Sequence, residues 1–149
     1  MKNHDIPDFR RRLMWHGIFL FLLALLTGFL IPALANPRMG VSAHLNGAMA
    51  GTFLVILGLV WRELRWTPKI AAVTFWIALF GTYMNWAFTL LGGILGTSRL
   101  TPLAGAGFSA PAWQETFVAA GLVPMTISMV ICGALVLFGL RGDSPLEKR

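Results

Sequence analysis

Residues 13–34 read LMWHGIFLFLLALLTGFLIPAL, a stretch with no charged side chain that is long enough to cross a membrane. Three more apolar stretches follow, at about residues 42–61, 69–95 and 113–140. About 20 helical residues span a hydrocarbon core of roughly 30 Å. Because lipid offers no hydrogen-bond partner to backbone N–H and C=O groups, each stretch is expected to be a helix. The sequence therefore predicts an all-α integral membrane protein with four spans.

The basic residues gather beside alternate loops of this expected topology. Of the 12 lysines and arginines, only Arg38 and Arg99 lie in the loops after the first and third spans. The others precede the first span, connect the second to the third, or follow the fourth: Lys2, Arg10, Arg11, Arg12, Arg62, Arg65, Lys69, Arg141, Lys148 and Arg149. This positive-inside pattern predicts that both termini are cytoplasmic. The net charge of +6 is thus a topology signal, and no nucleic-acid partner is expected.

Short connections between the spans predict one up-down four-helix bundle at residues 13–141. We expect a basic cytoplasmic leader at residues 1–12 and a cytoplasmic tail at 142–149. Pro37 and Gly40 are interpreted as turn formers after the first span. The residues ALA at 33–35 also resemble a signal-peptide cleavage site, but the apolar stretch before them exceeds the usual length of about 7–15 residues. The expected location is a bacterial-type inner membrane, crossed several times.

Polar side chains within the apolar stretches are the candidate functional residues, because such groups are costly in a membrane and are usually functional. The stronger candidates are His16, His44, Asn46, Asn85, Gln114 and Glu115, and the weaker ones are Thr82, Tyr83 and Thr89. On the expected topology, every strong candidate except His16 lies in the outer half of the bundle. His16 lies near the inner face, where its ring can reach the lipid headgroups.

His44 shares a helical face with Gly47 and Gly51, which lie three and seven residues after it. The glycines fit two interpretations. They allow another helix to pack closely, as small residues at this spacing commonly do. Alternatively, they leave room below His44 for a flat ligand such as haem, whose iron a neutral imidazole binds. In that interpretation Glu115 orients the second ring nitrogen of His44.

Asn85 shares a face with Gly81 and Thr89. Two roles stay open for its amide, which needs a hydrogen-bond partner in hydrocarbon. It either bonds to a neighbouring helix or orients a polar group of a substrate.

Three motifs resemble the small membrane mutases and isomerases that include hydroxylaminobenzene mutase and styrene oxide isomerase. They are MWHGIFLFLLALLTGFLIPALANPRMGVSAHLNG at 14–47, GTYMNW at 81–86 and AWQE at 112–115. The resemblance extends over residues 13–141 and is closer to the mutase branch. It implies four membrane helices and, for the epoxide isomerase branch, a trimer with haem b. The histidine that binds iron in that branch corresponds to His44, and its third-helix asparagine to Asn85.

Two positions depart from the epoxide isomerase branch. Where that branch has an asparagine six residues after its histidine, this chain has Ala50, and where it has a tyrosine four residues after its third-helix asparagine, this chain has Thr89. Asn46 is expected on a different helical face from position 50. Both departures concern the substrate pocket of that branch, so they argue against epoxide isomerisation and leave the haem site untouched.

The resemblance implies an isomerase that rearranges a small aromatic substrate without net redox change. The leading expectation is hydroxylaminobenzene to 2-aminophenol, with haem iron, bound by His44, as Lewis acid. Gly47 and Gly51 would complete the cofactor site, and Asn85, Asn46 and Glu115 would be catalytic, with Glu115 also a candidate to carry a proton. Membrane lipid and further copies of the chain are the expected partners.

Other reactions and classes stay open from the sequence. The alternative reaction is styrene oxide to phenylacetaldehyde. A small haem electron carrier usually presents two axial ligands to one iron, whereas His16 and His44 are expected at opposite membrane faces. A small multidrug-type transporter needs a carboxylate within the membrane, for which Glu115 is the candidate.

Overall fold

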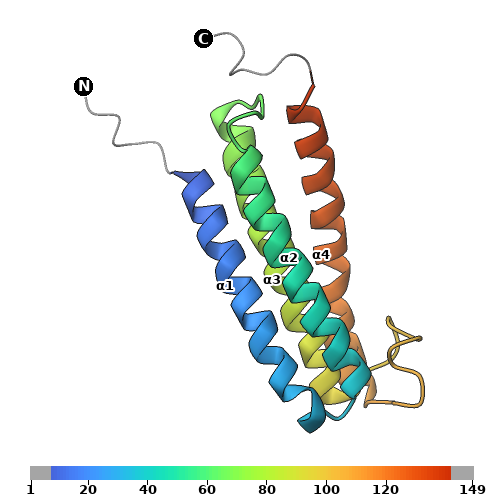
Figure 1. The fold of residues 1–149 in the computed structure, drawn as a ribbon. Helices are drawn as coiled ribbons and strands as arrows, with labels where there is room; N and C mark the ends of the chain where they lie inside the picture. Colours follow the sequence, from blue (N-terminus) through green and yellow to red (C-terminus); the bar gives the residue numbers. More distant parts are fainter. Residues whose placement is uncertain (1–7, 142–149) are drawn as a thin grey trace.

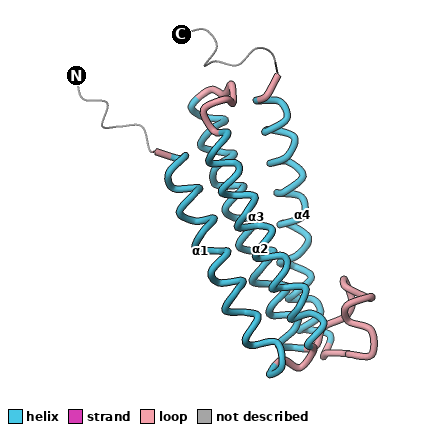
Figure 2. Tube along the Cα trace, in the orientation of Figure 1, coloured by secondary structure: helices cyan, strands magenta, loops and turns pink. Residues whose placement is uncertain are grey.

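The computed structural model describes residues 8–141, and no strand occurs in this part of the chain. Its elements are α1 (Phe9–Leu30), the short 3-10 turn η1 (Ile31–Ala33), α2 (Pro37–Val60), α3 (Pro68–Leu95) and α4 (Ala112–Gly139). The four helices lie side by side, and the connecting loops lie at the two ends (Figures 1 and 2). The all-α fold class predicted from the hydropathy pattern is confirmed.

All four helices are long and apolar enough to cross a membrane. Large apolar side chains point away from the protein on each of them. Phe29 on α1 is 83% exposed, and Leu137 on α4 is 66% exposed. Because exposed apolar surface of this extent marks contact with a membrane or a partner, these helices indicate a multi-pass membrane protein.

Glycines bring α1 and α2 into backbone contact. A Cβ atom added to Gly51 would lie 2.6 Å from the carbonyl oxygen of Gly17, and one added to Gly17 would lie 2.6 Å from that of Gly51. Further along, a Cβ on Gly58 would lie 2.9 Å from the carbonyl oxygen of Arg10. No side chain fits at these positions. The close-packing interpretation is therefore the one that the structure gives for Gly51.

α4 packs on α3 alone among the helices, and α2 and α4 do not approach each other. Gly121 lies against the ring of Phe88, and Gly81 lies against the side chain of Met129. The bundle is therefore open between α2 and α4. This opening, which forms the pocket described below, was not predicted from the sequence.

Two helices begin at a proline that follows a capping side chain. The hydroxyl of Thr67 accepts from the amide of Ile70 at 3.4 Å, one turn into α3. The side-chain oxygen of Asn36 accepts from the amides of Arg38 and Met39 at 3.1 and 3.3 Å. Proline suits the first helical position because the missing N–H would be unpaired there.

α2 therefore begins at Pro37, five residues before the expected start at residue 42. The prediction that Pro37 and Gly40 form a turn was wrong. Both lie within the first turns of α2, where Gly40 packs against Leu34 and Ile31.

One end of the bundle brings together the start of α1, the α2–α3 connection and the end of α4. The rings of Phe9 and Trp61 meet edge to face with centroids 6.0 Å apart. The amide of Arg65 donates to the carbonyl of Gly139 at 2.8 Å. The α3–α4 loop lies at the opposite end (Figure 2).

Gly51→Val is expected to lower the free energy of unfolding by about 1–3 kcal/mol, because an added side chain forces α1 and α2 apart. Denaturant unfolding of the detergent-solubilised protein measures this. Gly133→Val is the matched control, since a Cβ at Gly133 meets no atom within 4 Å. An equal loss in both variants would show that helix propensity, and not the close approach, sets the cost.

Candidate active site

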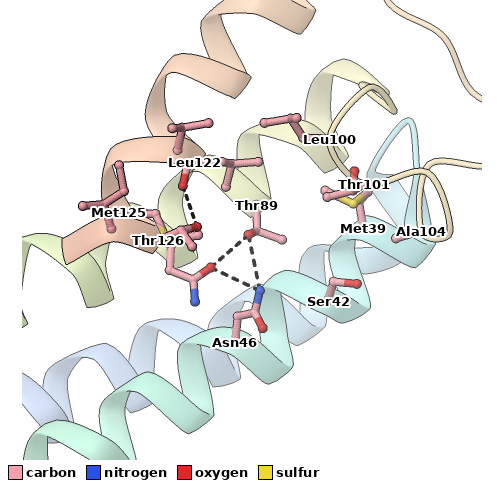
Figure 3. A pocket seen from close by; sticks show the side chains of 13 residues that line it. Met39, Ser42, Asn46, Thr89, Leu100, Thr101, Ala104, Leu122, Met125 and Thr126 are labelled. Atoms are coloured by element: carbon pink, nitrogen blue, oxygen red, sulfur yellow. Dashed lines mark hydrogen bonds between the residues drawn. The ribbon is translucent and has the colours of Figure 1, made fainter. Parts of the chain in front are cut away.

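A pocket of about 570 Å³ lies between α2, α3, α4 and the α3–α4 loop. Its polar lining residues are Ser42, Asn46, Asn85, Thr89, Thr101 and Thr126. The rest of the wall is aliphatic or methionine, and no charged side chain lines it (Figure 3). A pocket of this size with an apolar wall and a few polar groups suits a small neutral ligand.

Three polar side chains of this pocket bind one another. The amide nitrogen of Asn46 on α2 lies 3.4 Å from the side-chain oxygen of Asn85 on α3 and 3.4 Å from the hydroxyl of Thr89. The Thr89 hydroxyl also lies 3.5 Å from the Asn85 oxygen. These bonds join α2 to α3 (Figure 3). The sequence interpretation grouped Asn46 with Asn85 and placed Thr89 on the face of Asn85, but it did not predict the bonds among them.

The network fixes which end of the Asn85 amide is available to a ligand. Its oxygen accepts from Asn46 and Thr89, and no hydrogen bond of residues 8–141 uses its nitrogen. An amide nitrogen carries two hydrogens. Asn85 therefore presents donors to a ligand in the pockets that it lines.

A second pocket of about 250 Å³ adjoins the first and shares Asn46 and Asn85 with it. Ala50 and Thr82 line this smaller pocket as well. Asn46 and Ala50 are one helical turn apart and therefore lie on the same face of α2. The prediction that they lie on different faces was wrong.

The α3–α4 loop covers the pocket at one end, where Leu100, Thr101 and Ala104 belong to the wall. Asn36 donates from its side-chain nitrogen to the carbonyl of Ala104 at 2.9 Å. The guanidinium of Arg38 donates to the carbonyl of Ala106. Asn36 and Arg38, at the start of α2, thus hold one side of the α3–α4 loop.

Glu115 holds the loop from the other side. Its carboxylate accepts from the amide of Ser98 at 2.9 Å and from the amide of Arg99 at 3.0 Å. Glu115 contacts neither His44 nor the pocket. The prediction that Glu115 orients the ring of His44 was wrong, and its geometry gives it a role in holding the loop.

His44 binds α1 instead. Its Nδ1 lies 2.7 Å from the carbonyl oxygen of Ala24. A carbonyl only accepts, so Nδ1 carries the hydrogen, and in the neutral ring Nε2 holds the lone pair. Gly28 makes room for this contact, since a Cβ there would lie 3.2 Å from Nδ1. A backbone partner that fixes the tautomer in this way is typical of metal-binding histidines.

Gly47 packs under the indole of Trp86. A Cβ on Gly47 would lie 2.6 Å from Cδ1 of Trp86 and 2.8 Å from the Cβ of Ala24. The indole nitrogen donates to the hydroxyl of Thr27 at 3.1 Å, so Trp86 connects α3 to α1 across α2. Protein atoms therefore fill the space beside Gly47 and Gly51 that the sequence interpretation assigned to a cofactor.

His16 is paired with another helix. Its Nδ1 lies 3.0 Å from the hydroxyl of Tyr83 on α3, and that hydroxyl lies 3.4 Å from the His16 carbonyl. The prediction that the ring reaches the headgroups was wrong, because Tyr83 engages it inside the bundle.

His44 and Asn46 point to opposite sides of α2, because two residues correspond to about 200° around a helix. His44 contacts Ala24 on α1, and Asn46 contacts Asn85 on α3. Within one chain, therefore, His44 does not belong to the wall of either Asn85 pocket.

Several residues of the site were not identified from the sequence, among them Ser42, Thr101, Thr126 and Gly28. Thr126 is a hydroxyl in an apolar stretch, two residues after a helix-internal proline, and this signal was available. Gly28 contacts His44 only because of how α1 and α2 align, and no pattern within one helix shows that alignment.

Comparisons with known proteins identify the family of the chain. Residues 9–141 match the sequence model of the styrene oxide isomerases. The chain belongs to this family. Hydroxylaminobenzene mutase HabB of Ectopseudomonas oleovorans is 47% identical over 132 residues, which cover 88% of this chain and 80% of HabB. HabA of the same organism is 36% identical over 125 residues, covering 83% of this chain and 93% of HabA. No solved structure matches.

The resemblance stated from the sequence motifs is thereby confirmed, and the chain is an isomerase of the mutase type. These matches favour an isomerase over the electron-carrier and transporter alternatives. Residues 8–141 contain no group of three or more His, Cys, Asp or Glu side chains that could hold a metal ion.

Glu115→Ala is expected to speed hydrogen exchange at the amides of Ser98 and Arg99, because the carboxylate that binds them is lost. Exchange measured by mass spectrometry or NMR checks this. The amide of Asn36, which donates to the Gly93 carbonyl at 2.9 Å, is the internal control. Unchanged exchange at Ser98 and Arg99 would contradict the role of Glu115 in holding the loop.

Proposed function

We propose that this chain is a membrane mutase that converts an arylhydroxylamine to an aminophenol, in the simplest case hydroxylaminobenzene to 2-aminophenol. The observation that carries the proposal is the neutral pocket with the Asn85 donor at its polar wall. The 47% identity to a hydroxylaminobenzene mutase supports the choice of substrate. A wall without charges favours an uncharged aromatic compound that partitions into lipid.

In this reaction the N–O bond breaks and the oxygen forms a bond to the ortho carbon of the ring. The proton lost from that carbon ends on the nitrogen. Substrate and product are therefore isomers, and no oxidant or reductant is consumed.

Asn85 is proposed to donate a hydrogen bond to the oxygen of the N–OH group as charge develops on it. A donor held in place before the reaction stabilises such charge most effectively where water is excluded. Asn46 and Thr89 hold the Asn85 oxygen, so the amide cannot rotate without losing both bonds. Leu122 and Met125 supply apolar wall against which the ring packs.

We further propose haem b as the cofactor, with His44 as the protein ligand of the iron. The fixed Nδ1–H of His44 leaves its Nε2 able to bind a metal, and His44 would hold the haem iron through this nitrogen. When bound, the iron would act as a Lewis acid that withdraws electron density from the heteroatom.

A centre that uses both His44 and Asn85 needs a second copy of the chain, because the two side chains belong to opposite sides of α2. We therefore propose a homo-oligomer, and the resemblance to the epoxide isomerase branch suggests a trimer. The homo-oligomer would place the His44 side of one copy beside the pocket of the next.

The proposed topology is an up-down bundle in a bacterial-type inner membrane with both termini cytoplasmic. The end of the bundle where Phe9 meets Trp61 and Arg65 meets Gly139 also carries most of the basic residues. Positive charge of this kind marks the cytoplasmic side.

Epoxide isomerisation is the second candidate reaction, because an epoxide oxygen also accepts from Asn85 and the matching family is that of the styrene oxide isomerases. Ala50 lines the smaller pocket, and Thr89 lines the larger one. The asparagine and tyrosine of the epoxide isomerase branch would therefore fall within these two pockets.

Purified protein is expected to convert phenylhydroxylamine to 2-aminophenol faster than it converts styrene oxide to phenylacetaldehyde. Asn85→Leu should lower kcat/KM for phenylhydroxylamine about 100-fold, since it removes one preorganised donor. Thr52→Val is the control, because Thr52 on α2 bonds only to the Ala48 carbonyl and lies outside both Asn85 pockets. Conversion of the epoxide alone would reverse the choice of substrate, and activity of Asn85→Leu equal to wild type would refute its role.

Wild-type protein purified in detergent is expected to show the Soret absorption of haem, and His44→Ala should abolish or shift it. Thermal unfolding of both proteins controls for misfolding. A wild type without haem absorption after expression with added haem precursor would refute the cofactor proposal.

A further inference from the structure

Thr126 lines the pocket, and its hydroxyl oxygen is available to accept a hydrogen bond from a ligand. Its hydrogen is committed to the backbone, because the oxygen lies 2.9 Å from the carbonyl of Leu122, with the Met125 sulfur at 3.9 Å as a longer alternative. No group of residues 8–141 donates to the Thr126 oxygen. A hydroxyl whose hydrogen is in use keeps its lone pairs for a ligand. Figure 3 shows Thr126 on α4, across the pocket from Asn46 on α2.

The packing of α4 on α3 sets the height of Thr126. Gly121 lies against Phe88, and Gly81 lies against Met129 and Ser128. Because the two helices run antiparallel, these contacts place Asn85 level with residue 124. Thr126 is two residues from that level, which corresponds to about 3 Å along the helix. Along the helix axis, Thr126 therefore lies within one turn of the level of Asn85.

Ser42 is the other hydroxyl of this kind, since it donates to the Arg38 carbonyl at 3.1 Å and lines the same pocket. The contacts of Gly47 with Trp86 and of Gly40 with Gly93 set its height. They place Ser42 about six residues, or about 9 Å, from the level of Asn85. One small polar group therefore reaches Asn85 and Thr126 together more readily than Asn85 and Ser42.

We infer that Thr126 is a specificity-determining residue, which accepts a hydrogen bond from the N–H of the substrate while Asn85 donates to the neighbouring oxygen. The inference rests on the proposed function and narrows its substrate class to aromatic compounds that carry an N–H beside the oxygen. An arylhydroxylamine satisfies both groups. An epoxide has an oxygen for Asn85 but no hydrogen for Thr126, so the site discriminates against it.

Equilibrium binding of two non-reacting probes tests this. Aniline has N–H donors, and N,N-dimethylaniline has none. Thr126→Val should weaken aniline binding about tenfold, as expected for the loss of one hydrogen bond, and leave N,N-dimethylaniline unchanged. Thr126→Ser keeps the hydroxyl and should bind aniline like wild type.

Thr116→Val is the matched control, because Thr116 also lies on α4, bonds to the carbonyl four residues earlier, and is outside the pocket. It should leave both probes unaffected. Equal weakening of both probes by Thr126→Val, no effect on either, or no binding of aniline by wild type would overturn the inference. Failure of wild type to convert phenylhydroxylamine, by contrast, would refute the proposed function while the probe comparison still decides the role of Thr126.

Discussion

A polar side chain within a membrane must find its hydrogen bonds inside the protein, and His44 and Asn46 of α2 do so with different helices. His44 bonds to the Ala24 carbonyl of α1, and Asn46 bonds to Asn85 and Thr89 of α3. Lipid cannot replace these partners. The two contacts fix the rotation of α2 between its neighbours, and with it the side on which each functional group lies.

The packing of the other helices follows from this rotation. The side of α2 that carries His44 can meet α1 closely because Gly17 and Gly51 bring the backbones together. The side that carries Asn46 meets α3 through side chains, and α4 stays away from α2. Asn46, Asn85, Thr89 and Thr126 line the resulting pocket together. The rotation of α2 therefore sets both the spacing between the helices and the polar side chains that line the pocket.

The sequence predicted the four helices because hydropathy and span length depend only on residues within each helix. It also identified His44, Asn46, Asn85 and Thr89 as the polar residues that need an explanation. It failed where the answer depends on the alignment of two helices. Glu115 was assigned to the ring of His44, whereas Ala24 binds it. The early start of α2 at Pro37 was readable from Asn36 before a proline, because a capping side chain followed by a proline also begins α3 at Thr67 and Pro68.

In the proposed homo-oligomer, one catalytic centre would use His44 and Asn85 from different copies of the chain. Co-expression of His44→Ala with Asn85→Leu, each of which is expected to have little activity alone, tests this proposal most directly through the mutase activity of the purified mixed oligomer. Random mixing in a symmetric oligomer should restore roughly a quarter of the wild-type activity, because some junctions then combine an intact His44 with an intact Asn85. Mixed oligomers as inactive as either parent would contradict the claim, since a centre confined to one chain cannot be complemented.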